Sequence, residues 1–91
     1  MNYKMNPKME LQELGSILNK MYSEALKGEA VTMIHLFGIL YSKEIEALGS
    51  SAIEIAKAAT IQESYGTEIR KGVNLAKYVV AKKAHTIKND V

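Results

Sequence analysis

The sequence contains no cysteine and no tryptophan, and only one proline and one phenylalanine among its 91 residues. Without cysteine the chain can form no disulfide framework, no thiolate metal site and no thiol nucleophile, which fits a reducing compartment. No stretch approaches the about 18 consecutive apolar residues of a membrane-spanning helix. The segment Met1–Pro7 also lacks the apolar core of a signal peptide. We therefore expect a cytoplasmic protein that packing alone stabilises.

The length and composition indicate one ordinary folded domain. A chain of this size has room for one hydrophobic core, since it buries about two thirds of its unfolded surface. Hydrophobic residues make up 47% of the chain and charged residues 24%, which are the proportions of a globular protein. We predict a single domain over residues 1–91, with flexible ends at 1–6 and 84–91.

Charge is divided unevenly along the chain. Up to Glu68 there are six lysines and nine glutamates, whereas from Ile69 to Val91 six basic residues stand against one acid, Asp90. A basic surface of this kind is typical of proteins that bind a polyanion. A solvated basic tail would give the same pattern, so charge alone does not decide between the two.

Apolar periodicity predicts an all-α fold, a compact bundle of about four helices. The first helix is expected from Asn6-Pro7, an N-cap followed by a favourable first helical position, to Gly28. The second is expected from about Thr32 to Gly49, which should adopt a left-handed cap. The core-facing side of the first helix is predicted to contain Leu11, Leu14, Leu18, Met21, Tyr22, Ala25 and Leu26.

The third predicted helix is short and opens with Ser51 and Glu54 at the spacing of a capping box. Ile53 is expected among the side chains that pack this helix against its neighbours. The last helix should run from about Ser64 towards Lys82. The predicted core draws on all four helices and contains Ile17, Leu18, Phe37, Leu40, Ile55, Ile69 and Val73.

At about 100° per residue, the last helix has one apolar and one polar side. The apolar side is predicted to consist of Tyr65, Ile69, Gly72, Val73, Ala76, Val79 and Val80. The opposite side contains no acidic residue and consists of Gly66, Thr67, Arg70, Lys71, Asn74, Lys77, Tyr78 and Ala81.

Two helices joined by a short turn, the second with a basic outer side, are typical of a helix-turn-helix. The segment Ala52–Lys71 resembles the helix-turn-helix signature of bacterial DNA-binding domains. Ile55-Ala56 matches the aliphatic and alanine pair of the first helix, and Ala59 matches the small residue after it. Ile61 and Ile69 match the aliphatic positions of the turn and of the second helix.

Two positions differ from this signature. Thr60 stands where the family usually has glycine, which tolerates a left-handed backbone. Gly66 stands where the family has an aliphatic residue, and we expect the neighbouring Tyr65 to take over its packing. The whole stretch from 33–39 through 64–69 also resembles helix-turn-helix modules attached to restriction or defence endonucleases.

The resemblance implies that residues 64–82 form a recognition helix in the major groove of DNA. Arg70 then suits bidentate contact to guanine and Asn74 contact to adenine. Short polar side chains at the start of the helix, Gln62, Ser64 and Thr67, can meet a base edge or a phosphate. The residues expected at phosphates are Lys71, Lys77 and Lys82.

Three side chains leave alternatives open. Tyr78 either contacts a phosphate or packs on the tail. Glu68 would repel phosphate unless it pairs with Lys71 or accepts a hydrogen bond from a cytosine amine. His35 is expected to point away from the core beside an exposed Ile39, and no ligand follows it three or four residues on, so no metal site is predicted. We interpret this exposed pair as a small self-association patch or a contact within a larger assembly.

Catalysis is not expected, because the glycines form neither a phosphate-binding loop nor a dinucleotide motif and no nucleophile and base pair is recognisable. We expect no cofactor either. Two functions remain. The chain is a DNA-binding module that dimerises or is tethered to a larger protein, or it is a helical protein-interaction or oligomerisation module without affinity for nucleic acid.

Overall fold

The structure, a computed structural model, describes residues 9–82. Every regular element in this range is helical, so the predicted all-α class is confirmed. The predicted flexible ends, 1–6 and 84–91, lie outside the described residues. No helix within 9–82 is long and apolar enough to cross a membrane. The elements are α1 (Leu11–Ser23), α2 (Ala30–Leu40), α3 (Ser42–Leu48), α4 (Ala52–Ala58), a 3-10 turn η1 (Glu63–Tyr65) and α5 (Gly66–Leu75).

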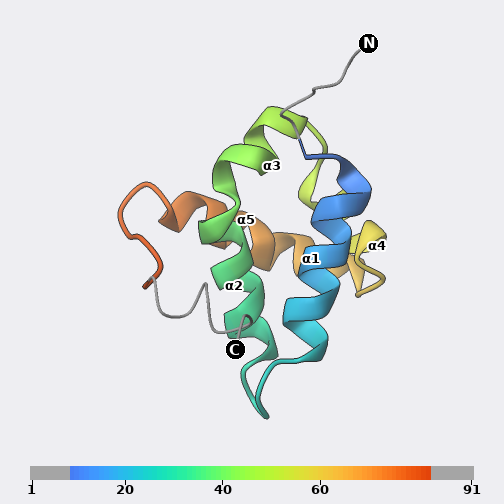
Figure 1. The fold of residues 1–91 in the computed structure, drawn as a ribbon, viewed down its shortest axis with the longest axis vertical. Helices are drawn as coiled ribbons and strands as arrows, with labels where there is room; N and C mark the ends of the chain where they lie inside the picture. Colours follow the sequence, from blue (N-terminus) through green and yellow to red (C-terminus); the bar gives the residue numbers. More distant parts are fainter. Residues whose placement is uncertain (1–8, 83–91) are drawn as a thin grey trace.

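Helices α1 and α2 lie side by side and are joined by a loop at one end of the molecule, and α5 packs across α2 (Figure 1). All five α-helices contribute to one apolar core. Five of the predicted core residues are buried there, namely Leu18, Phe37, Ile55, Ile69 and Val73. Ile17 is partly buried and packs against this core, whereas Leu40 is partly buried outside it, so the prediction of Leu40 as a core residue is wrong.

Helix α1 is shorter at both ends than predicted. It begins at Leu11, because the backbone N–H of Glu10 donates to Glu13 Oε1 at 2.9 Å and so caps the first turn. It ends at Ser23, whose hydroxyl donates to the carbonyl of Asn19 within the helix. Leu26 therefore lies in the loop, 71% exposed, and its prediction on the core-facing side is wrong.

The predicted second helix is divided in two at Tyr41, which has φ −113° and ψ 23°. Backbone hydrogen bonds continue through this residue, since Tyr41 N–H donates to the carbonyl of Phe37 and the Tyr41 carbonyl accepts from Ile45 N–H. The apolar periodicity therefore continues across the distortion, and α3 begins at the next residue, Ser42. Gly49 ends α3 with φ 81°, which confirms the predicted left-handed cap.

The crossing of α2 and α5 is the tightest contact between helices. A Cβ atom built on Gly72 would lie 2.3 Å from the carbonyl oxygen of His35, and one on Gly38 would lie 2.6 Å from that of Ile69. Distances this short leave no room for any side chain, so the two backbones touch directly. Glycine at both positions thereby fixes α5 on α2.

His35 and Ile39 do not form the predicted exposed patch. Both side chains are partly buried, and the His35 ring faces α5, where its Nε2 lies 2.6 Å from Glu68 Oε1. His35 lies outside the apolar core, as expected, but its ring contacts Glu68 on α5 instead of facing solvent beside Ile39. The predicted self-association patch at Ile39 is also wrong, because this side chain is partly buried.

Candidate nucleic-acid interface

Helix α4 begins with the predicted capping box. The Ser51 hydroxyl accepts from Glu54 N–H, and Ser51 N–H donates to Glu54 Oε1, both at 3.1 Å. Behind this cap α4 buries Ile55 and Ala56. Ile53 is 50% exposed instead of packed, so its prediction as a packing residue is wrong.

The turn after α4 contains Thr60 with φ 63°, the one non-glycine residue with positive φ within 9–82. Thr60 thus adopts the left-handed conformation that the family signature gives to glycine. This conformation costs a residue with a Cβ about 1–2 kcal/mol. The turn is held in place from outside, because Asn19 Nδ2 on α1 donates to the carbonyl of Ala59 at 2.8 Å.

Gly66 begins α5 where it meets the start of α4. A Cβ atom there would lie 3.1 Å from Ile53 N, so a larger residue would push the two helices apart. Tyr65 packs against the core instead, with its ring centroid 5.5 Å from that of Tyr22, which confirms the expected exchange of roles.

Helix α5 ends at Leu75, so the predicted recognition helix over 64–82 is too long. In the turn that follows, Lys77 N–H donates to Asn74 O and Tyr78 N–H to Leu75 O, which is the tighter three-residue pattern. The β-branched side chains of Val79 and Val80 have weak helix propensity. Both are exposed, which contradicts their predicted place on an apolar side.

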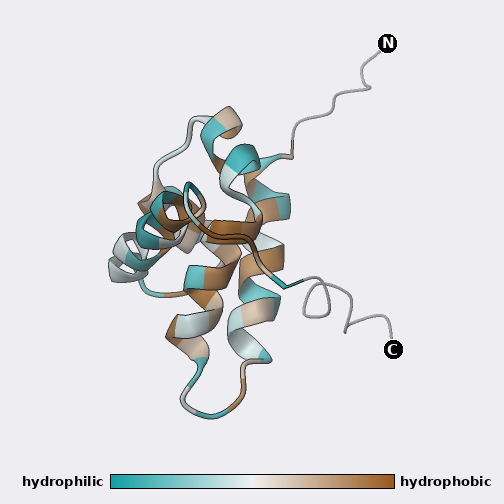
Figure 2. Ribbon diagram, turned by 90° about the vertical axis from the view of Figure 1, so that its left-hand side faces the viewer, coloured by the Kyte–Doolittle hydropathy of each residue, from teal (hydrophilic) through white to brown (hydrophobic). Residues whose placement is uncertain are grey.

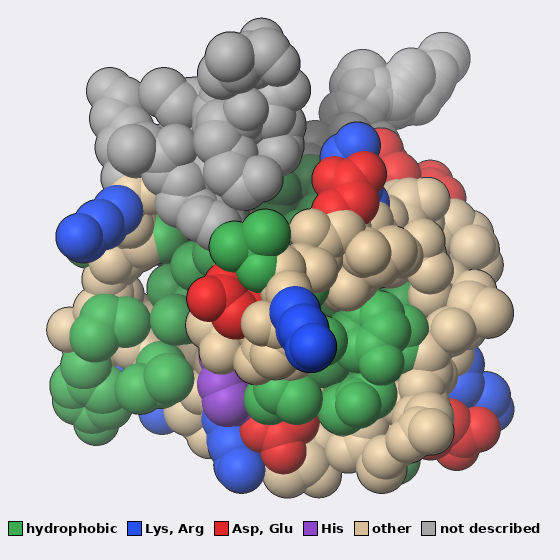
Figure 3. Space-filling model, turned by 90° about the horizontal axis from the view of Figure 1, so that it is seen from below, with side chains coloured by type: hydrophobic (Ala, Val, Ile, Leu, Met, Phe, Trp, Pro, Cys, Tyr) green, Lys and Arg blue, Asp and Glu red, His purple; other side chains and the backbone are tan. Residues whose placement is uncertain are grey.

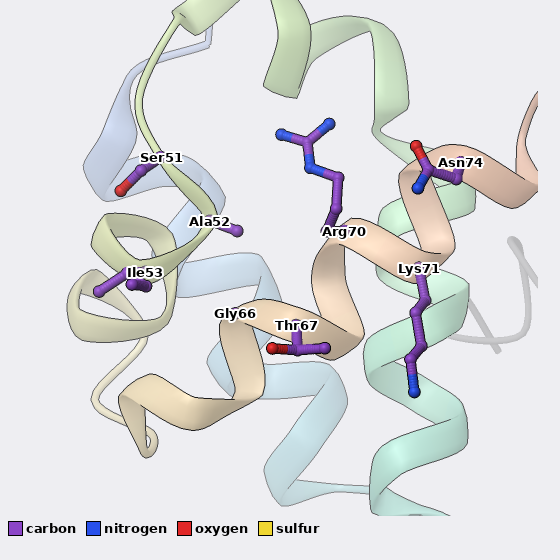
Figure 4. A pocket seen from close by; sticks show the side chains of 8 residues that line it. All are labelled: Ser51, Ala52, Ile53, Gly66, Thr67, Arg70, Lys71 and Asn74. Carbon is purple, nitrogen blue, oxygen red and sulfur yellow. The ribbon is translucent and has the colours of Figure 1, made fainter.

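An open, shallow depression of about 500 Å³ lies between the start of α4 and the outer side of α5 (Figure 4). In this view the Arg70 side chain rises from α5 towards α3, Lys71 extends the opposite way, and Thr67 lies between them and Gly66. The depression therefore brings together four residues predicted from sequence, Thr67, Arg70, Lys71 and Asn74, and three that were not, Ser51, Ala52 and Ile53.

Both cations at the depression are paired with a carboxylate. Arg70 Nη1 donates to Glu46 Oε2 on α3 at 3.2 Å. Lys71 Nζ lies 3.4 Å from Glu68 Oε1, which confirms the pairing considered for Glu68. The hydrogen bond from His35 and the charge of Lys71 hold the pKa of the Glu68 carboxyl below its usual range. A carboxylate accepts hydrogen bonds only, so His35 Nε2–H is the donor.

The surface of the described part of the chain mixes both signs of charge. Residues 9–82 contain eight basic and nine acidic side chains. Figure 3 shows acidic and basic groups interspersed over one face, with no block of a single sign. The described residues visible on this face therefore form no broad basic surface.

The remaining predicted site residues lie outside the depression. Gln62 precedes η1 and Ser64 lies within it, both exposed. Lys77 and Tyr78 occupy the turn after α5, and Lys82 follows in non-helical chain. An exposed apolar run of four residues lies around them, namely Leu75, Tyr78, Val79 and Val80. Figure 2 shows a hydrophobic stretch of coil, in brown, shortly before the C-terminal trace.

The two helices α4 and α5, the turn between them and the depression they share define a helix-turn-helix unit supported by α1, α2 and α3. A family model described as an HTH-like domain matches residues 10–82. The match covers most of the chain, which therefore belongs to the family of HTH-like domains. No curated protein and no solved structure matches the chain significantly.

Proposed function

We propose that this chain binds duplex DNA, with α5 in the major groove and the depression facing the duplex. One observation carries the proposal: the outer side of α5, next to the start of α4, presents Thr67, Arg70, Lys71 and Asn74 together. Arg70 fits guanine and Asn74 fits adenine, each by two hydrogen bonds. Lys71, Lys77 and Lys82 are the groups proposed to contact phosphates.

The length of α5 limits what one copy can read. Ten residues span about 15 Å, which matches the width of a major groove but covers only a few base pairs. We therefore propose that the chain acts as a homodimer or tethered to a larger protein, because two linked modules gain effective concentration. In this proposal it is a binding module and not an enzyme. Its association with restriction or defence systems stays a prediction from the resemblance.

A titration of labelled duplex at several salt concentrations tests the proposal. Three lysines at phosphates predict a log–log slope of about −3, since each neutralised phosphate contributes about −0.9. Lys77→Ala should weaken binding to every sequence and reduce the slope by about one unit. Arg70→Ala should cost about 1–3 kcal/mol on a selected site and less on random duplex. Lys20→Ala, on α1 beside Glu24, is the matched control and should change nothing.

Two outcomes contradict this reading. Equal, sequence-independent losses from Arg70→Ala and Lys77→Ala would leave a general phosphate-binding surface without base readout. No loss from either variant would show that the outer side of α5 is only solvated.

The exposed apolar run favours a second function, self-association with another copy of the chain. Tyr78 is 83% and Val80 90% exposed, which is unusual for neighbouring apolar residues in a monomer. Sedimentation of the protein without DNA tests this function. A dimer that Val80→Ser disrupts would support it, whereas a monomer at all concentrations would exclude it.

A further inference from the structure

The ion pair between Arg70 and Glu46 links the proposed recognition side to a helix outside the helix-turn-helix unit. Glu46 lies on α3, 24 residues before Arg70, and accepts from Arg70 Nη1 at 3.2 Å. Both side chains are exposed, 44% for Arg70 and 63% for Glu46. Arg70 lines the depression while it holds this contact, so the pair and the open site exist in one conformation.

We propose that Glu46 is a positioning residue that directs Arg70 to guanine, an inference that rests on the proposed binding of DNA. A guanidinium has five N–H donors in a rigid fork, and the contact to Glu46 occupies only Nη1. The donors on Nη2 and Nε stay available for the O6 and N7 acceptors of one guanine. Glu46 thus orders the side chain without using the donors that the base requires.

The charge of Glu46 acts in the same direction as its geometry. An arginine without an ion-pair partner at this surface would contact phosphate and guanine with similar affinity. A carboxylate beside the guanidinium lowers the net charge at the site and repels a phosphate, while the neutral base edge meets no such repulsion. Glu46 therefore lowers affinity for the backbone in general and raises the share of binding that depends on sequence.

The second ion pair on α5 shows why this role belongs to Glu46 and not to Glu68. Glu68 pairs with Lys71, whose ammonium group has no fork and binds phosphate as a point charge. Glu68 is also fixed by His35, so changing it disturbs the α2–α5 crossing. Among residues 9–82, Glu46 has Arg70 as its one ion-pair partner, so a variant at Glu46 acts on Arg70 alone.

The preference for one base over another distinguishes two roles of Glu46. A positioning role changes this preference, whereas a purely electrostatic role changes affinity for all duplexes alike. Duplexes are first selected from a random pool by the wild-type chain, and the guanine read by Arg70 is located by the position at which Arg70→Ala loses preference. Affinities are then measured for the selected duplex, for one with this guanine replaced, and for random duplex. Glu46→Gln is compared with Glu44→Gln, which removes the same charge from the same helix without touching Arg70.

We expect Glu46→Gln to reduce the preference for guanine about three- to tenfold while affinity for random duplex stays the same or rises. Glu44→Gln should keep the preference. Exposed ion pairs contribute little to stability, so Glu46→Gln should fold, which circular dichroism checks. Preference unchanged in Glu46→Gln, or both affinities raised by the same factor, would overturn the positioning role alone. Failure of the wild-type chain to bind any duplex would overturn the proposed function and this inference with it.

Discussion

The two sides of α5 follow different rules. On the inner side Ile69, Gly72 and Val73 are buried, and at Gly72 no Cβ could be added without moving the backbone of α2. On the outer side Arg70 and Lys71 are exposed and are each held by a single carboxylate. Packing of the inner side therefore determines where the helix lies. The side chains that face the depression do not take part in this packing. Under the proposed function, contacts to DNA determine their identities.

The largest expected effect on stability comes from a cavity in the core against which the inner side of α5 packs. Phe37 is fully buried on α2, so Phe37→Ala should lower the free energy of unfolding by about 3–5 kcal/mol. Lys71→Ala on the outer side should change it by less than about 0.5 kcal/mol. Urea unfolding of both variants measures the difference. Equal urea midpoints for Phe37→Ala and Lys71→Ala would contradict the proposed difference between the inner and outer sides of α5.

A single methyl group tests the inner side directly. Gly72→Ala would place a Cβ 2.3 Å from the carbonyl oxygen of His35. The resulting shift of α5 should cost about 1–3 kcal/mol or more, which outweighs the gain of about 1 kcal/mol in helix propensity. Asn74→Ala, two positions further along, should leave stability equal or slightly higher. A Gly72→Ala protein more stable than the wild type would show that the helices can separate without loss.

The turn that leads to α5 should gain stability from a glycine. Thr60→Gly removes a left-handed strain of about 1–2 kcal/mol and adds an entropic penalty of about 0.5–1 kcal/mol, so a net gain of about 0.5–1 kcal/mol is expected. The melting temperature should rise by a few degrees. Thr67→Gly, in ordinary helical conformation, should lower it. A lower melting temperature for Thr60→Gly would mean that the threonine side chain stabilises the turn.

The smallest effect concerns Glu68, which lies where the two sides meet. Its folded pKa is below the ordinary 4.5, because His35 donates to the carboxylate and Lys71 adds positive charge. A depressed pKa stabilises the fold above the unfolded value, and this contribution is lost as pH falls through the folded value. Glu68→Gln should therefore be less stable than the wild type at about pH 6, with the difference shrinking below about pH 4. A difference that stays constant in urea unfolding over this range would contradict the assignment.

Local patterns predicted much of this fold. The caps at Gly49 and Ser51 and the helix-turn-helix spacing are properties of a few neighbouring residues, so the sequence displays them directly. The division at Tyr41 is invisible because the apolar period continues through it. The sequence does not reveal the early end of α5, because Val79 and Val80 keep the helical spacing although both are exposed.

The candidate site was predicted only where it lies on one helix. Thr67, Arg70, Lys71 and Asn74 share a side of α5 by periodicity alone. Glu46 comes from a helix more than twenty residues away, and Ile53 comes from α4, which meets α5 at Gly66. Residue spacing within one helix cannot predict these contributions, since they depend on how separate helices pack together.

The contact between Gly38 and Gly72 makes α2 and α5 a rigid joint, because no deformable side chain separates the two backbones. We therefore expect the two helices to move as one body. A pair of spin labels on these helices, introduced by Thr32→Cys and Asn74→Cys into a chain that has no other cysteine, should therefore give one narrow distribution of distances. The same measurement in a Gly72→Ala background would record how far the joint opens.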